Sequence, residues 1–195
     1  AGIEAADSLA LDPHKWLHAP FELGCALVRD GTALLRTFSL TPEYLKGATR
    51  GIAAGTAHHL CDLGLQTTRG FRALKLWMSL REHGANHFGA LIDRNIDQAR
   101  LLACRLEAAG VEVHRPVGLN IVCFRHRVPG LDAAAMQQFN REVMIGLQEE
   151  GLAAVSDTVL DGRHYLRAAI ANHRTADADI DLFVDAFLRA ARRRA

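Results

Sequence analysis

Near the start of the chain, residues 7–17 read DSLALDPHKWL, and this segment is the most informative part of the sequence. Its centre, Asp12-Pro13-His14-Lys15-Trp16, predicts a tight turn, because proline fixes its own φ angle and cannot continue a strand. Partial burial in these apolar surroundings would penalise the ammonium form of Lys15 and make its amine a better nucleophile toward an aldehyde. The residues alone also allow an ordinary surface lysine that keeps its charge in water.

Outward from this turn, the first part of the chain predicts few regular elements. An apolar run at 25–28 indicates a buried strand, and Asp30 can cap a short helix that runs to about residue 37. Between residues 39 and 64 the hydrophobic periodicity is lost and glycines recur, which predicts a mobile loop. Helical spacing resumes at Phe71 and ends near Gly84.

From about residue 85 onward the pattern predicts helix, strand, strand, helix, strand, strand, helix, which is a compact α+β unit. The expected strands are 111–114, 119–124, 152–155 and 165–170. The first 84 residues hold too few strands for a sheet of their own, so we expect them to join strands that lie outside this chain.

Composition and charge narrow the class of protein. The 195 residues carry 23 Lys+Arg against 22 Asp+Glu, a net charge of +1, so we expect neither a nucleic-acid partner nor a membrane partner. Four widely spaced cysteines without a CxxC pair predict reduced thiols in a cytoplasmic protein and no metal site. The chain opens at Ala1 without Met, so we expect it to be a piece of a longer protein.

Four segments, in order, resemble the group II pyridoxal-phosphate-dependent amino-acid decarboxylases, and in particular the aromatic-L-amino-acid decarboxylases. They are residues 7–17, the run FSLTPEYL at 38–45, QTTRGFRALKLW at 66–77 and LRAAIANHRT at 166–175. The resemblance covers essentially the whole chain, but only the second half of the family's chain. It implies an α/β fold, that of the fold-type-I pyridoxal-phosphate-dependent transferases, in a homodimer with the active site at the subunit interface.

By the same resemblance, residues 1–84 would be the C-terminal part of the large cofactor-binding domain, with the cofactor lysine, the mobile loop 39–64 and the following helix. Residues 85–195 would be the small C-terminal α+β domain. Lys15 would carry pyridoxal 5'-phosphate and release it to the substrate amine, and His14 would lie by the cofactor phosphate. Tyr44 matches the loop tyrosine that protonates the substrate Cα after decarboxylation, a role that suits a phenol delivered by a closing lid.

Thr68, with Thr67, lies where family members shape the substrate pocket of the neighbouring subunit, and we expect Thr68 to contact the cofactor. An alternative role for these hydroxyls is to cap a helix that starts near Arg69. Arg69, Arg72 and Lys75 are expected to form structural ion pairs.

The resemblance implies decarboxylation of an L-amino acid, with aromatic amino acids favoured, to the amine and carbon dioxide. The family's Asp that pairs with the pyridine nitrogen, its ring-stacking residue and much of its phosphate loop lie upstream of Lys15, so we expect this chain alone to catalyse little. One alternative is a non-catalytic, truncated C-terminal dimerisation fragment. The other is a related enzyme with transaminase or aldehyde-forming activity, against which the presence of Tyr44 counts.

Overall fold

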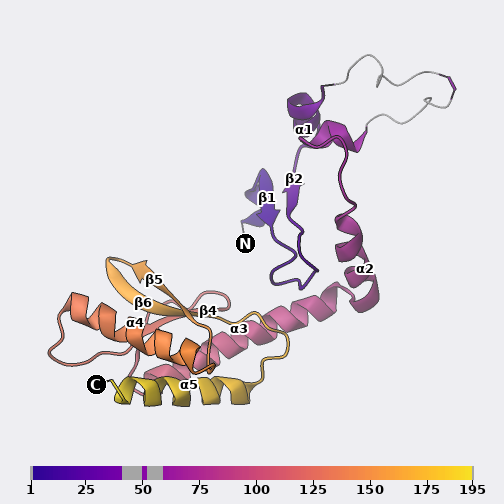
Figure 1. Ribbon diagram of the computed structural model, residues 1–195. Coiled ribbons are helices and arrows are strands. Elements are labelled where there is room, and N and C mark those ends of the chain that lie inside the picture. Colours follow the sequence, from indigo (N-terminus) through magenta and orange to yellow (C-terminus); the bar gives the residue numbers. More distant parts are fainter. Residues whose placement is uncertain (1, 41–49, 52–58, 195) are drawn as a thin grey trace. The chain divides into compact units, whose positions relative to one another are not determined.

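The computed structural model describes residues 2–40, 50–51 and 59–194. The chain divides into two compact units, Ala1–Gly84 and Ala85–Ala195, and each is taken by itself (Figure 1). Within the described ranges, no helix is both long enough and apolar enough to cross a membrane.

The first unit is organised around a two-stranded antiparallel ribbon. Strand β1 (Ser8–Leu11) pairs with β2 (Cys25–Val28), and the register runs from Ser8 opposite Val28 to Leu11 opposite Cys25. The strand predicted at 25–28 is confirmed, but its predicted burial is wrong, since Ala26 and Leu27 are exposed. Strand β1 was not predicted from the sequence. Because the strands pair at their Leu11 and Cys25 ends, residues 12–24 form a closed loop between them, and this loop carries Lys15.

The described residues of the first unit also form the helical elements η1 (Ile3–Ala5), α1 (Gly31–Phe38), η3 (Leu60–Leu63) and α2 (Ala73–His83). The predicted cap of the first α-helix is confirmed, since the side chain of Asp30 accepts a hydrogen bond from Thr32 N at 2.9 Å. Most of the predicted mobile loop 39–64 lies outside the described residues, and its described end contains η3. The hydrogen bond from Asp62 N to His59 O, at 2.9 Å, closes this short turn of 3-10 helix.

The second unit is a four-stranded sheet with three helices. The elements, in chain order, are α3 (Ala85–Ala108), β3 (Glu112–Val113), β4 (Ile121–Arg125), α4 (Ala133–Glu149), β5 (Ser156–Leu160), β6 (Arg163–Ala169) and α5 (Asp177–Arg192). The sheet order is β3-β4-β6-β5 with antiparallel pairs throughout. The predicted succession of helices and strands is therefore confirmed.

One predicted strand is misplaced. The apolar run 152–155 was expected to pair, but the structure places β5 at Ser156–Leu160, directly after that run. Within this run, Val155 is buried in the core and Ala153 packs against it, so these two side chains contribute to packing without belonging to a strand. The pairing residues that follow are largely polar because β5 is an edge strand of the sheet.

The core of the second unit lies between the sheet and its helices. Val122 and Phe124 of β4 point inward, as does Leu166 of β6, and all three are fully buried. The ring of Phe124 meets Phe187 of α5 edge to face at 5.2 Å. Helix α5 also packs against α3 and α4 (Figure 1), so the three helices share one core.

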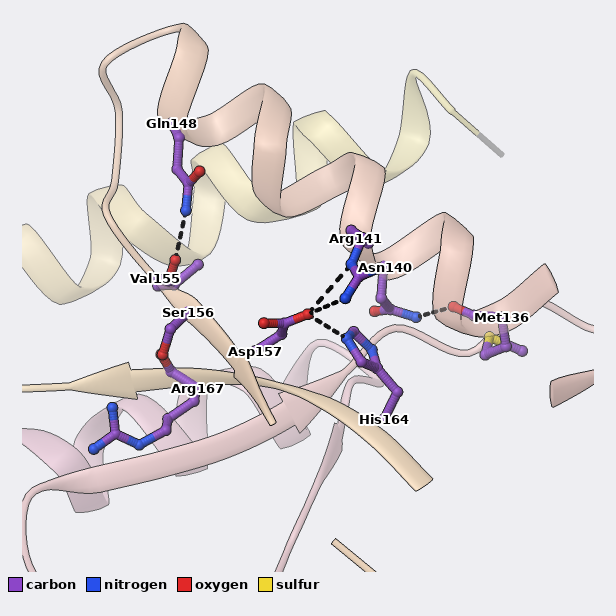
Figure 2. Close-up of polar contacts among 9 residues, drawn as sticks. All are labelled: Met136, Asn140, Arg141, Gln148, Val155, Ser156, Asp157, His164 and Arg167. Carbon is purple, nitrogen blue, oxygen red and sulfur yellow. Dashed lines mark hydrogen bonds and ion pairs between the residues drawn. The ribbon is translucent and has the colours of Figure 1, made fainter. Parts of the chain in front are cut away.

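Polar contacts fasten α4 to the β5–β6 hairpin (Figure 2). One oxygen of Asp157 lies 3.0 Å from both Arg141 Nη2 and His164 Nε2. Further along the helix, Gln148 Nε2 donates to Val155 O at 2.7 Å. These bonds tie the edge strand to the helix that covers it.

Candidate functional site

The loop that carries Lys15 is a series of tight turns. Lys15 N donates to Asp12 O at 2.9 Å, which closes a four-residue turn with Pro13 in its second position. Ala19 N donates to Pro13 O at 3.0 Å, and the Pro13 side chain is fully buried. The proline thus fixes the start of the loop, and Lys15 projects from an ordered turn.

The amine of Lys15 is held by an acidic neighbour. Its Nζ lies 2.6 Å from Asp12 Oδ2, and the side chains of Lys15 and Asp12 are 70% and 44% exposed. The hydrogen bond from Lys15 keeps the pKa of the Asp12 carboxyl below its ordinary value. Of the two alternatives that the residues alone leave open, the structure shows the surface lysine, because the turn directs the Lys15 side chain outward to a carboxylate. In this structure the Lys15 amine is accessible and paired with the Asp12 carboxylate.

His14 is anchored to the far end of the same loop. Its Nδ1 lies 2.5 Å from Leu23 O and 3.3 Å from Leu23 N, and Phe21 meets the ring edge to face at 5.1 Å. The imidazole is thus fixed in orientation through one nitrogen, which leaves Nε2 as the ring nitrogen that can face a ligand.

A cavity of about 410 Å³ lies beside Asp12, between the ends of the two strands. It is lined by Ala10, Leu11, Asp12, Gly24, Cys25 and Ala26. Five of these six residues are apolar or small, so the Asp12 carboxylate is the charged group in the lining. A cavity of this composition suits an organic ligand with a cationic or hydrogen-bond-donating group next to the acid.

The predicted role of Thr68 in capping a helix is wrong. Helix α2 begins at Ala73, several residues later than expected, and its N-cap residue Arg72 makes no side-chain capping bond. Thr68 is exposed in the segment before the helix. Its hydroxyl is therefore accessible to a ligand, and its expected contact with the cofactor stays a prediction.

The segment around Thr68 is tied to the end of the lysine loop. Arg72 Nη2 forms an ion pair with Glu22 Oε1 at 2.8 Å, as expected for a structural arginine. Lys75 instead donates to two backbone oxygens, of Pro20 at 3.0 Å and of Glu22 at 3.2 Å. These contacts hold the start of α2 against residues 20–22.

A second cavity, of about 550 Å³, lies where these two segments meet, with Leu23, Gln66, Arg69 and Phe71 in its lining. Sequence reasoning assigned Arg69 to structural ion pairs and did not anticipate this cavity. It also missed Asp12, although the i, i+3 spacing of an acid and a lysine across a proline turn is a signal that could have indicated the pair. Tyr44 lies outside the described residues.

The comparisons with known proteins agree on one family. Residues 1–127 match the family described as "Pyridoxal-dependent decarboxylase conserved domain". An aromatic-L-amino-acid decarboxylase of Bacillus atrophaeus is 35% identical over 182 residues, which cover 92% of this chain and 37% of that protein. The chain thus spans well under half the length of that relative.

Solved structures give the same result. The structure of Oryza sativa TDC with PLP and tryptamine has a TM-score of 0.88 at 29% identity, over 98% of this chain and 40% of that chain. Catharanthus roseus tryptophan decarboxylase in complex with L-tryptophan has a TM-score of 0.83 at 27% identity, over 100% of this chain and 40% of that chain. These likenesses confirm the α/β fold expected of a fold-type-I transferase. With the ordered lysine turn and the match over residues 1–127, they establish that the chain belongs to the pyridoxal-dependent decarboxylase family.

Proposed function

We propose that this chain forms part of an enzyme that decarboxylates an L-amino acid with pyridoxal phosphate and releases the amine and carbon dioxide. The observation that carries the proposal is the accessible amine of Lys15, held on an ordered turn within the segment that matches the family. Aromatic amino acids are the favoured substrate class, because the relatives include aromatic-L-amino-acid, tryptophan and tyrosine decarboxylases.

The described part of the chain supplies a group that can bind the aldehyde of the cofactor. A primary amine on a rigid turn, 70% exposed, is the group needed to bind an aldehyde covalently. Lys15 would carry the cofactor, while His14 Nε2 and the exposed Thr68 hydroxyl would contact it. When bound, pyridoxal phosphate supplies an electron sink for the electron pair that remains when carbon dioxide leaves.

In this proposal the remaining chemistry of the chain is proton delivery. Tyr44 would donate its phenolic proton to the substrate Cα after carbon dioxide has left. A phenol is protonated at neutral pH, so it arrives in the form that the step requires.

The larger organisation follows from the same assignment. Residues 1–84 would be the end of the large cofactor-binding domain, and residues 85–195 the small C-terminal domain. We propose a cytoplasmic homodimer with the active site at the subunit interface. The four cysteines are free, which is the state that the reducing cytosol maintains.

Borohydride reduction tests the assignment of Lys15. The purified protein is incubated with pyridoxal phosphate, reduced, digested and mapped by mass spectrometry. We expect the reduced cofactor on the peptide that contains Lys15. We do not expect it on the peptide that contains Lys75, whose amine donates hydrogen bonds to two backbone carbonyl oxygens. In the whole enzyme of which this chain would form part, release of carbon dioxide should be faster from aromatic than from acidic L-amino acids. A cofactor adduct confined to other lysines would refute the assignment.

A further inference from the structure

The proline turn places a carboxylate and the lysine amine side by side. Asp12 occupies the first position of the turn and Lys15 the fourth. The backbone hydrogen bond from Lys15 N to Asp12 O, 2.9 Å long, closes the turn. Pro13, between them, has a restricted φ angle and a fully buried side chain. The turn thus brings the two side chains within reach of one another, and Asp12 Oδ2 lies 2.6 Å from Lys15 Nζ.

Asp12 also faces the cavity beside the loop. It lines the space of about 410 Å³ between the strand ends, and a Cβ atom built on Gly24 would lie 3.9 Å from Asp12 Oδ1. Thus Oδ2 holds the Lys15 amine while Oδ1 lies on the side of Gly24, which is a lining residue of the same cavity. The carboxylate joins the amine to the space where an organic ligand can sit.

This contact has a chemical consequence for the amine. An amine attacks an aldehyde through its nitrogen lone pair, so the nitrogen must be free to turn toward the aldehyde. A neighbouring carboxylate that accepts a hydrogen bond from the amine holds the nitrogen in one place. We propose that Asp12 is a positioning residue for Lys15, whose carboxylate holds the amine through the 2.6 Å contact and thereby sets how readily it reacts. The inference rests on the proposed function only in its assumption that Lys15 is the residue that binds the cofactor.

Competitive acetylation measures the reactivity of Lys15 without any cofactor. The chain is treated with a trace of acetic anhydride at neutral pH, and the labelled peptides of Lys15 and Lys75 are compared. In this reaction the amine nitrogen bonds to the acyl carbon, acetate leaves, and the proton passes to solvent. We expect Asp12→Asn to raise the ratio of Lys15 to Lys75 labelling by about two- to fivefold, the range of exposed ion pairs. Asp12→Glu, which keeps the charge, should return the ratio toward the wild-type value.

The salt dependence separates this role from a merely structural one. Added salt should raise Lys15 labelling in the wild type, by screening the pair, but not in Asp12→Asn. The salt measurement needs no variant, so it stands even if Asp12→Asn folds poorly.

The outcomes distinguish this inference from the proposed function. A Lys15 to Lys75 ratio that is unchanged by Asp12→Asn and by salt overturns the role of Asp12, even if borohydride places the cofactor on Lys15. Conversely, a raised ratio together with a cofactor adduct elsewhere supports the pair and refutes the assignment of Lys15 as cofactor lysine.

Discussion

Tyr44 is the residue whose hydroxyl is assigned the last proton transfer. In Tyr44→Phe the ring remains and only the acid is lost, so we expect cofactor and substrate to bind while amine release slows by about a hundredfold or more. Rapid-quench measurement of amine against carbon dioxide in the cofactor-loaded protein checks this. The matched control is Tyr165→Phe, because the Tyr165 hydroxyl donates to Glu112 Oε1 at 3.0 Å in the second unit. Equal amine release by both variants would remove Tyr44 from the mechanism.

For single residues of the candidate site, the motif predicts which residue would carry the cofactor, but the surroundings of that residue are known only from the structure. The sequence predicts Lys15 as the cofactor residue from a string of neighbours. Its surroundings could not be predicted, because exposure depends on which way a turn directs a side chain. The outward path of Lys15 follows from the burial of Pro13 and the anchoring of His14 to Leu23. These are contacts between residues up to nine positions apart, which periodicity does not encode.

Among the elements, the long helices are predicted well, whereas strands β1 and β5 are not. Helix α3 repeats its apolar stripe over several turns, so its hydrophobic period is unambiguous. Strand β5 is a mostly polar edge strand whose pairing depends on β6. An edge strand is defined by its partner and not by its own hydrophobicity, so the neighbouring apolar run 152–155 was taken for it.

The bonds of β5 to its neighbours make the stability of the second unit depend on pH. Hydrogen bonds from His164 and Arg141 lower the pKa of Asp157 below its ordinary value of 3.8. Because that pKa is lower in the folded chain, the stabilisation is complete above the unfolded value and is lost as the pH falls through the folded value. We expect Asp157→Asn to cost about 2 kcal/mol of unfolding free energy at neutral pH.

Thermal unfolding of the wild type and Asp157→Asn across a pH series checks this expectation. The two melting temperatures should converge in acid below the ordinary pKa of 3.8, where the wild-type carboxyl gains its proton. Asp185→Asn is the control, since Asp185 is an exposed carboxylate of α5 and its change in charge is the same. A difference in melting temperature that stays constant from neutral to acid pH would show that the Asp157 carboxylate does not act through its charge.

At the scale of the whole molecule, the two units bury very different amounts of apolar surface. In the described part of the first unit, only Pro13, Ala19 and Leu23 are buried. The second unit has a continuous core of buried residues drawn from its sheet and all three helices. Apolar burial is the main favourable term in folding, so the second unit must hold most of the stability of this chain.

Amide hydrogen exchange of the intact chain should show this contrast directly. We expect the slowest amides in the β4–β6 pair, which opens only with the whole core, and fast exchange in the β1–β2 pair. Both strand pairs are antiparallel, and they differ in the apolar core that packs against the β4–β6 pair. Each pair is therefore the control for the other. Equal protection would mean that the first unit is stabilised by contacts other than its own burial. Slower exchange in β1–β2 alone after addition of pyridoxal phosphate would instead place the bound cofactor beside the lysine loop, because a ligand stabilises the part of the chain that binds it.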